Sequence, residues 1–147
     1  MFVSNNKHSK IKIMALGGLG ETGKNMYVVD VNDKIFILDA GLKYPEEDLL
    51  GVDAVIPDFK YLIDNKEKIV GLFLTHAHEE HIGAVPNLLK NLNIPVYGTR
   101  FTMALVEDAL RDDSENIENY QLKIIKNTNV LTFSDVQISF FSQTHSI

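Results

Sequence analysis

The feature that most constrains this chain is a group of histidines directly after a short apolar segment. Three of the chain's five histidines, His76, His78 and His81, lie within six consecutive positions together with Glu80. The preceding segment, Ile69–Leu74, has the composition of a buried strand. On an extended backbone alternate side chains share one face, so His76 and His78 can close on a single ion. A helical turn near Glu80 would direct its carboxylate and His81 toward a neighbouring position, where a second ion could bind.

The donor types narrow the choice of metal. Imidazole and carboxylate together favour zinc, manganese or a similar cation, and the chain has no cysteine that could supply a thiolate. Two divalent ions about 3.5–4 Å apart can share a hydroxide and stabilise the oxygens of a phosphoryl or acyl centre. A single histidine is more often an ordinary core or surface residue than a ligand. Because three of them occur here beside a carboxylate, we expect a site for two divalent ions, zinc or manganese.

Size and charge restrict the classes of protein that fit. The 147 residues, 45% of them apolar, can bury one core and indicate one domain or part of one. No apolar segment is long enough for a membrane span, the first residues lack a secretory signal, and the missing cysteines favour a cytoplasmic protein. The net charge of −6 argues against a broad surface for nucleic acid. The acidic residues of 107–118 are best interpreted as a solvated face.

A glycine-rich segment near the N-terminus allows two interpretations. Gly18, Gly20 and Gly23 formally spell the G-x-G-x-x-G pattern of dinucleotide-binding proteins, which requires a helix to begin at the glycines. The residues that follow, 25–31 and 34–39, are instead rich in β-branched and aromatic side chains and are separated by Asn-Asp. Two strands joined by a tight turn are therefore predicted, and the nucleotide site is not.

The rest of the chain alternates between strands and helices. We expect strands at 10–16, 69–74, 96–98, 122–126, 130–133 and 136–141, and helices at 58–68, 84–92 and 99–112. Asp58 is the expected N-cap of the first helix, with Phe59, Leu62 and Ile63 on its apolar face. Thr99 is expected to cap the last helix, whose apolar face includes Met103, Leu105, Val106 and Leu110. The result is a layered α/β protein.

Two further residues follow predicted strand ends. Asp39 could accept a hydrogen bond from a metal-binding histidine, or it could be an ordinary turn aspartate. His145 could complete a set of three nitrogen ligands for the first ion, and its spacing alone does not decide this.

Several motifs together carry a resemblance to a known family. The segment His76–His81 resembles the H-x-H-x-D-H signature of the metallo-β-lactamase superfamily. The match narrows to the ribonuclease J family, in the β-CASP branch, and extends from about Lys10 to the last residue. It rests on Gly17–Asn25 (GGLGETGKN), Leu38–Gly41 (LDAG), Leu74–His76 (LTH), Ile82–Pro86 (IGAVP) and Thr144–Ile147 (THSI).

The resemblance implies both a fold and an activity. The fold would be the N-terminal half of a four-layer αββα sandwich, and the activity metal-dependent RNA hydrolysis, endonucleolytic and 5′ to 3′ exonucleolytic, in mRNA decay and rRNA maturation. By resemblance, His76, His78 and His145 would hold one ion, while Glu80 and His81 would serve the second ion and catalysis. Asp39 would support a ligand histidine by a hydrogen bond.

The sequence departs from the family pattern at two points. Glu80 replaces the aspartate of the signature, and the chain ends at Ile147, before the β-CASP and C-terminal parts that the resemblance implies. We therefore expect a flexible arm at 1–9 and the N-terminal part of a metallo-β-lactamase domain at 10–147, inactive alone. The alternatives are a non-catalytic partner subunit of an active paralogue and another hydrolase of the superfamily. A homo- or hetero-oligomer is expected for the full-length protein.

Overall fold

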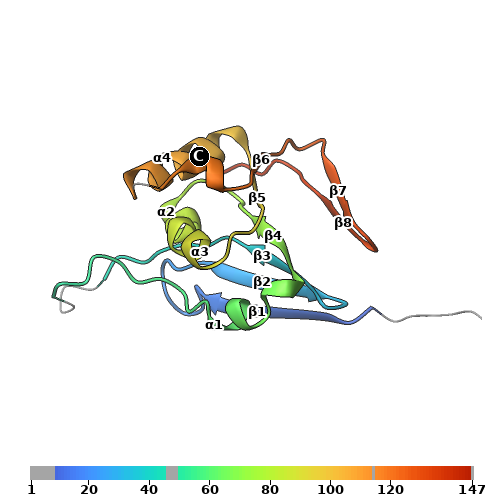
Figure 1. Cartoon of the computed structure of the whole chain (residues 1–147), viewed down its shortest axis with the longest axis horizontal. Coiled ribbons are helices and arrows are strands. Elements are labelled where there is room, and N and C mark those ends of the chain that lie inside the picture. Colours follow the sequence, from blue (N-terminus) through green and yellow to red (C-terminus); the bar gives the residue numbers. More distant parts are fainter. Residues whose placement is uncertain (1–8, 46–49, 114, 147) are drawn as a thin grey trace, which may run out of the picture.

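A six-stranded sheet forms the centre of the protein. The computed structural model describes residues 9–45, 50–113 and 115–146, so the expected arm at 1–9 lies outside the described residues except for Ser9. The strands follow one another across the sheet in chain order (Figure 1). They are β1 (Ile11–Gly17), β2 (Met26–Val31), β3 (Lys34–Leu38), β4 (Ile69–Phe73), β5 (Val96–Gly98) and β6 (Leu122–Ile124). Neighbours from β1 to β3 are antiparallel and those from β3 to β6 are parallel, which confirms the α/β class.

The turn between β2 and β3 has the predicted chemistry. Asn32 and Asp33 have φ angles of 52° and 64°. This left-handed backbone is the one that a two-residue hairpin turn needs and that asparagine and aspartate tolerate. β2 begins soon after the glycine loop, residues 17–23, where a dinucleotide site would require a helix. The predicted strand pair is confirmed, and the dinucleotide interpretation is excluded.

Alternation along the strands divides the core between the two faces of the sheet. In β3, Ile35 and Ile37 point to one face and Phe36 points to the other. The first face is covered by helices α1 (Lys60–Asp64), α3 (Val85–Asn91) and α4 (Arg100–Asp112), seen beside the sheet in Figure 1. Leu62, Leu88 and Leu110, one from each helix, have no exposed surface in this layer.

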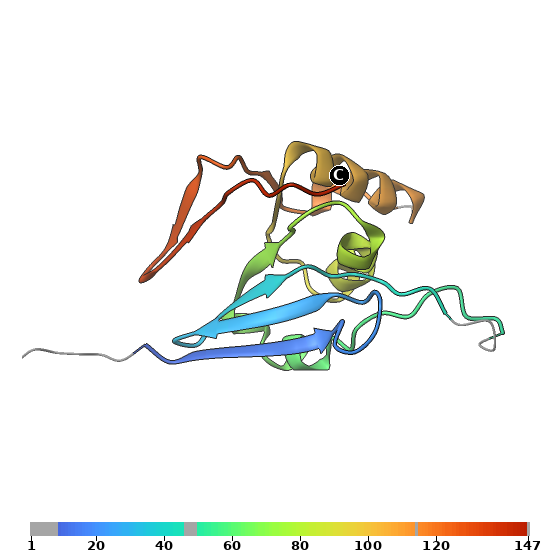
Figure 2. The same ribbon diagram turned by 180° about the vertical axis from the view of Figure 1, so that it is seen from behind.

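A separate hairpin covers part of the second face. β7 (Val130–Phe133) and β8 (Val136–Ser139) pair with each other in a two-stranded antiparallel sheet, at the opposite side of the view from the end of α4 (Figure 2). The ring of Phe133 lies 5.7 Å from that of Phe36, and 6.1 Å from those of Phe73 and Tyr97. The layers are therefore helices, a main sheet and the start of a second sheet, as expected for part of an αββα sandwich.

A polar clamp holds the tip of this hairpin. Asp135, in the turn between β7 and β8, accepts hydrogen bonds from Asn32 Nδ2 at 2.9 Å and from Lys34 Nζ at 2.6 Å. The bond from Lys34, and then that from Asn32, lowers the pKa of Asp135 to about 2. The hairpin is thereby joined to the main sheet at its far end as well as through the aromatic rings.

The prediction for the first helix is wrong in its length. Helix α1 ends at Asp64, and a separate 3-10 turn, η1 (Lys66–Lys68), follows it. Asn65 interrupts the helix because its side-chain amide donates to the carbonyl of Tyr61 at 2.9 Å, in competition with the backbone. Phe59 occupies the N-cap position, but the carboxylate of Asp58 accepts the N–H of Lys60 at 2.8 Å, as the predicted cap would. Ile63 is 43% exposed instead of facing the core.

The last predicted helix is largely confirmed. Thr99 caps α4, and its hydroxyl accepts the backbone N–H of Thr102 at 3.4 Å. Leu105 is 36% exposed, so its assignment to the apolar face was wrong. The acidic segment that follows contains a 3-10 turn that the sequence did not predict, η2 (Ile117–Asn119). Arg111 bridges Glu107 and Asp108 on the surface of α4, as a solvated face would allow.

Candidate metal centre

The candidate residues gather where two parallel strands end. Asp39 directly follows β3, and its N–H donates to the carbonyl of Phe73 at the end of β4. The chain after β4 runs on through His76 and His78 into a short helix, α2 (Glu79–Ile82). His78 has extended backbone angles, φ −69° and ψ 144°. The carboxyl ends of β3 and β4 therefore place an aspartate beside the histidine segment, as parallel sheets commonly do with binding residues.

The turn after β3 packs tightly against α2. Ala40 N donates to His81 O at 2.8 Å and Leu42 N donates to Glu79 O at 3.0 Å. Between them, a Cβ atom on Gly41 would overlap the carbonyl group of Glu80. Glycine is required at this position because any side chain would force the two backbones apart.

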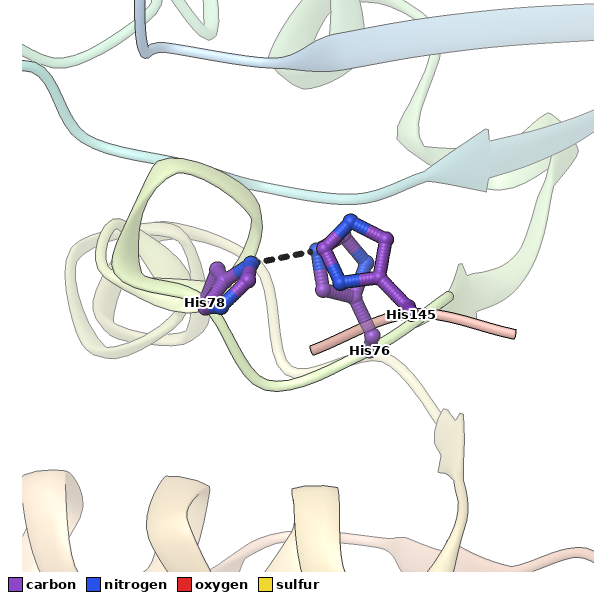
Figure 3. Close-up of side chains that lie close together, drawn as sticks. All are labelled: His76, His78 and His145. Carbon is purple, nitrogen blue, oxygen red and sulfur yellow. Dashed lines mark hydrogen bonds between the residues drawn. The ribbon is translucent and has the colours of Figure 1, made fainter. Parts of the chain in front are cut away.

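Three histidines from two distant parts of the chain converge on one point (Figure 3). His76 Nε2 and His78 Nδ1 lie 3.0 Å apart, and the ring of His145 lies 4.4 Å and 4.8 Å from theirs. One nitrogen from each ring falls within 4.8 Å of the other two. Ligand atoms in a tetrahedral zinc site with bonds of about 2.0–2.1 Å are about 3.3 Å apart. The arrangement thus fits one ion after a small adjustment of His145.

The buried carboxylate of Asp39 organises two of the ligand candidates. Its Oδ1 accepts the Thr75 N–H at 2.8 Å, and its Oδ2 accepts the Thr75 hydroxyl at 2.9 Å. With its proton given to Asp39, the Thr75 oxygen accepts Nδ1–H of His76 at 2.9 Å. Asp39 Oδ2 also lies 2.7 Å from His81 Nδ1, which must donate to it. Both rings therefore direct an unprotonated Nε2 away from Asp39, the state that metal binding requires.

Asp39 is itself held in an uncommon backbone conformation. Its φ is 61°, and only 4% of its surface is exposed. Non-glycine residues in this region are uncommon and concentrate at functional sites, and aspartate is among those that tolerate it best. The contacts of Asp39 to Thr75 and His81 therefore favour the supporting role over that of an ordinary turn aspartate.

Glu80 and His81 lie beside the three histidines. The ring of His81 is 4.1 Å from that of His76. Glu80 is exposed on α2 and lines an open pocket of about 240 Å³ together with His76, His78, His81 and His145. These two residues fall outside the group of three nitrogens within 4.8 Å of one another. Their assignment to a second ion stays a prediction.

Electrostatics near the site favour neutral imidazole. Burial lowers the pKa of His76, and the neighbouring rings of His81 and His145 lower it further. The His76 ring is therefore neutral at neutral pH. Because a protonated ring has no lone pair to offer, the lowered pKa reduces competition between protons and a metal ion at this nitrogen.

Two polar residues at the site were not predicted from the sequence. Thr75 connects Asp39 to His76, and the amide of Asn25 approaches the ring of His81 at 3.3 Å. Thr75 could have been noticed because it directly precedes the first histidine and can hydrogen-bond locally. Asn25 ends the Gly17–Asn25 motif, but nothing local connects it with His81, which lies 56 residues away.

The family assignment comes from comparison with known sequences. The profile of the Metallo-beta-lactamase superfamily matches residues 19–137, which is most of the chain. The chain belongs to the metallo-β-lactamase superfamily. The match includes His76 and His78, and the expectation drawn from the motifs is confirmed at the level of the family.

Curated relatives within the superfamily are ribonucleases. The chain is 47% identical to Ribonuclease J 2 of Staphylococcus aureus (strain MRSA252) over 148 residues, which covers 100% of this chain and 26% of the relative. It is 46% identical over 147 residues to Ribonuclease J 2 of Staphylococcus saprophyticus, with the same coverage. The resemblance to ribonuclease J is confirmed. The chain spans about a quarter of the length of these relatives.

Solved structures agree with the metallo-β-lactamase fold. The metallo-beta-lactamase fold protein YhfI from Bacillus subtilis gives a TM-score of 0.60 at 19% identity, and the match covers 93% of this chain and 54% of that one. Zinc-bound PqqB from Methylobacterium extorquens gives 0.57 at 15% identity, covering 88% and 55%. Within residues 9–45, 50–113 and 115–146, no helix combines the length and apolar character needed to cross a bilayer.

Proposed function

We propose that this chain is part of a metal-dependent RNA hydrolase of the ribonuclease J type. The observation that carries the proposal is the meeting of His76, His78 and His145 at the carboxyl end of the main sheet. The identity of 47% to Ribonuclease J 2 from Staphylococcus aureus supports RNA as the substrate class. We further propose both endonucleolytic and 5′ to 3′ exonucleolytic cleavage. A cytoplasmic location and an oligomeric full-length protein stay predictions.

We propose a role for each residue of the donor set. His76, His78 and His145 would hold one divalent ion, and Glu80 and His81 would contribute to a second. Zinc and manganese both suit imidazole and carboxylate ligands. When bound, two such ions would lower the pKa of a shared water and stabilise the entering and leaving oxygens of a phosphodiester.

The chain's own groups prepare the site for those ions. Asp39 accepts Nδ1–H of His81 at 2.7 Å, and it holds His76 through the Thr75 hydroxyl at 2.9 Å. Each bond fixes one tautomer and one ring direction, so less ordering remains when an ion binds. Glu80, exposed in the open pocket, leaves its carboxylate accessible to a second ion and to substrate.

Glu80 favours a second candidate function. It replaces the aspartate of the family signature and is one methylene longer, at a position where ligand distances vary by only a few tenths of an ångström. A displaced second ion would make the protein a non-catalytic partner of an active paralogue. Substrates other than RNA, such as thioesters or lactams, have less support because the relatives at 46–47% identity are named ribonucleases.

The test uses the protein encoded by the complete reading frame. It is incubated with 5′-monophosphorylated RNA and either manganese or zinc, and released mononucleotides are separated from internal fragments. We expect cleavage, and we expect His145→Ala to lower it by more than about 100-fold, beyond the usual effect of losing a residue that only supports a ligand. Asn91→Ala, on the surface of α3, is the control.

Three outcomes would decide between the candidates. If neither ion supports any cleavage of RNA, the hydrolase proposal is wrong. If Glu80→Asp raises turnover strongly, the partner-subunit function is favoured for the natural protein. If this substitution gives no gain, the partner proposal loses the observation that motivates it.

A further inference from the structure

The hydroxyl group of Ser146 lies between two of the three converging histidines. Its Oγ is 3.3 Å from Nε2 of His78 and 3.3 Å from Nδ1 of His145. Ser146 directly follows His145 and is 68 positions from His78, so it connects the two chain segments that meet at the site. The contacts of Asp39 organise the other two rings of the centre, those of His76 and His81.

The two ring nitrogens of His78 have different partners. Its Nδ1 lies 3.0 Å from Nε2 of His76, and its Nε2 faces Ser146. Nε2 of His76 is unprotonated, because that ring donates its Nδ1–H to Thr75. The contact between the two rings therefore needs the His78 proton on Nδ1, and His78 Nε2 can then only accept. In this tautomer the Ser146 hydroxyl donates to Nε2.

Metal binding requires the opposite tautomer of His78. To share one ion, Nε2 of His76 and Nδ1 of His78 must both offer a lone pair, so the His78 proton has to move to Nε2. There it points at Ser146 Oγ, which has lone pairs to accept it. A hydroxyl group both donates and accepts, so Ser146 can bond His78 in either tautomer and leaves the Nδ1 position to the ion.

The second contact of Ser146 selects one tautomer of His145. A serine hydroxyl has one hydrogen and two lone pairs. If the hydrogen is given to His78, Nδ1 of His145 must be the donor to Oγ. If His78 donates instead, the oxygen can still accept from both rings. In either case His145 carries its proton on Nδ1 and keeps Nε2 unprotonated, on the ring that Figure 3 shows beside those of His76 and His78.

We propose that Ser146 is a positioning residue for the first metal ion, one that directs Nδ1 of His78 and Nε2 of His145 toward it. Each bond leaves the ligand nitrogen free, because the hydroxyl contacts the opposite nitrogen of the ring. The inference rests on the proposed metal centre, since Ser146 acts there only through the two histidines.

The proposal predicts a loss of zinc affinity when the hydroxyl is removed. Contacts that orient metal ligands typically contribute 10–100-fold to affinity. Because Ser146 is exposed to water, Ser146→Ala should weaken the site of His76, His78 and His145 by about 10-fold, at the lower end of this range. Ser146→Thr keeps the hydroxyl and should restore most of the loss. Affinity is measured by chelator competition on the metal-stripped, full-length gene product.

Two controls separate this role from other effects. Ser142→Ala also removes an exposed hydroxyl from the same segment, but that hydroxyl accepts from Asn127 Nδ2 at 3.4 Å, and zinc binding should not change. In a His81→Ala background Ser146→Ala should cause the same loss as in the wild type, because its ring contacts are to His78 and His145. Circular dichroism checks that each variant is folded.

Imidazole ¹⁵N shifts of the zinc-loaded protein test the tautomers directly. They should place the protons on Nε2 of His78 and Nδ1 of His145. The inference is overturned if zinc is bound through either of these nitrogens, if Ser146→Ala binds zinc as tightly as the wild type, or if Ser146→Thr is as weak as Ser146→Ala. If the wild-type protein binds no zinc, the proposed metal centre fails as well, so the two failures are distinguishable.

Discussion

Replacing Asp39 by asparagine tests how the metal centre is organised. The substitution keeps the shape of the side chain and suits the left-handed backbone, where φ is 61°. The remaining side-chain oxygen can still accept from Thr75, but an NH₂ group then faces His81 Nδ1–H. In the wild-type protein this nitrogen lies 2.7 Å from Oδ2 of Asp39. Because two donors cannot bond each other, His81 should change tautomer and carry its proton on Nε2, where a metal would bind.

The size of the effect follows from this lost bond. A hydrogen bond to a charged group contributes about 1.5–3 kcal/mol, and each 1.4 kcal/mol corresponds to a factor of ten. The zinc affinity of the site that uses His81 should therefore fall by about 10–100-fold. Chelator competition measures this affinity, and ¹⁵N chemical shifts of the imidazole nitrogens report the tautomer of His81.

Asp30→Asn is the matched control. Asp30 is also buried, with 3% of its surface exposed, and it accepts from Lys12 Nζ and from the Asp33 N–H, both at 3.0 Å. Both substitutions should lower the free energy of unfolding, but only Asp39→Asn should change zinc binding. The reasoning is refuted if His81 keeps its proton on Nδ1 in the Asp39 variant and both zinc affinities equal those of the wild type.

Three further substitutions test the fold around the site. Gly41→Ala should lower the free energy of unfolding by about 1–3 kcal/mol in urea titrations, because the new methyl overlaps the backbone of α2; an unchanged midpoint would contradict the tight approach. Lys34→Met removes the ammonium group 2.6 Å from Asp135, so NMR titration should show the pKa of Asp135 rising from about 2 toward 3.8, whereas an unmoved titration would argue against the clamp. Since the pKa of Asp135 is depressed in the folded state, the ion pair of Lys34 and Asp135 stabilises the protein above pH 3.8. This stabilisation is lost as the pH falls through about 2. Phe133→Ala removes a half-buried ring 6.1 Å from Phe73 and should cost about 2 kcal/mol in thermal unfolding; a loss close to zero would mean that the hairpin does not depend on this contact.

Local sequence patterns were sufficient to predict much of the sheet and part of the candidate metal centre. The β-branched and aromatic residues of 34–39 predict a strand, and Asn32-Asp33 predicts the turn that precedes it. The spacing of His76 and His78 places both rings on one side of an extended segment. These features depend on residues within a few positions of one another, so they can be recognised without knowledge of the fold.

Local patterns failed where neighbouring side chains compete with the backbone. The helix predicted through Lys68 ends at Asp64 because the Asn65 amide bonds to the Tyr61 carbonyl. The exposed positions of Ile63 and Leu105 depend on where each helix lies against the sheet, which helical periodicity alone does not specify. Both errors come from contacts whose strength the sequence does not display.

The sequence by itself determined the family, the pair of strands around Asn32-Asp33 and the candidate histidines, because each is encoded in short motifs. Only the tertiary structure decided that His145 meets His76 and His78, and that Asp39 reaches Thr75 and His81. The physical reason is that these contacts join residues brought together by the sheet and by the hairpin clamped against it. A contact between residues tens of positions apart has no signature in local composition or periodicity, so it becomes visible only when the chain is folded.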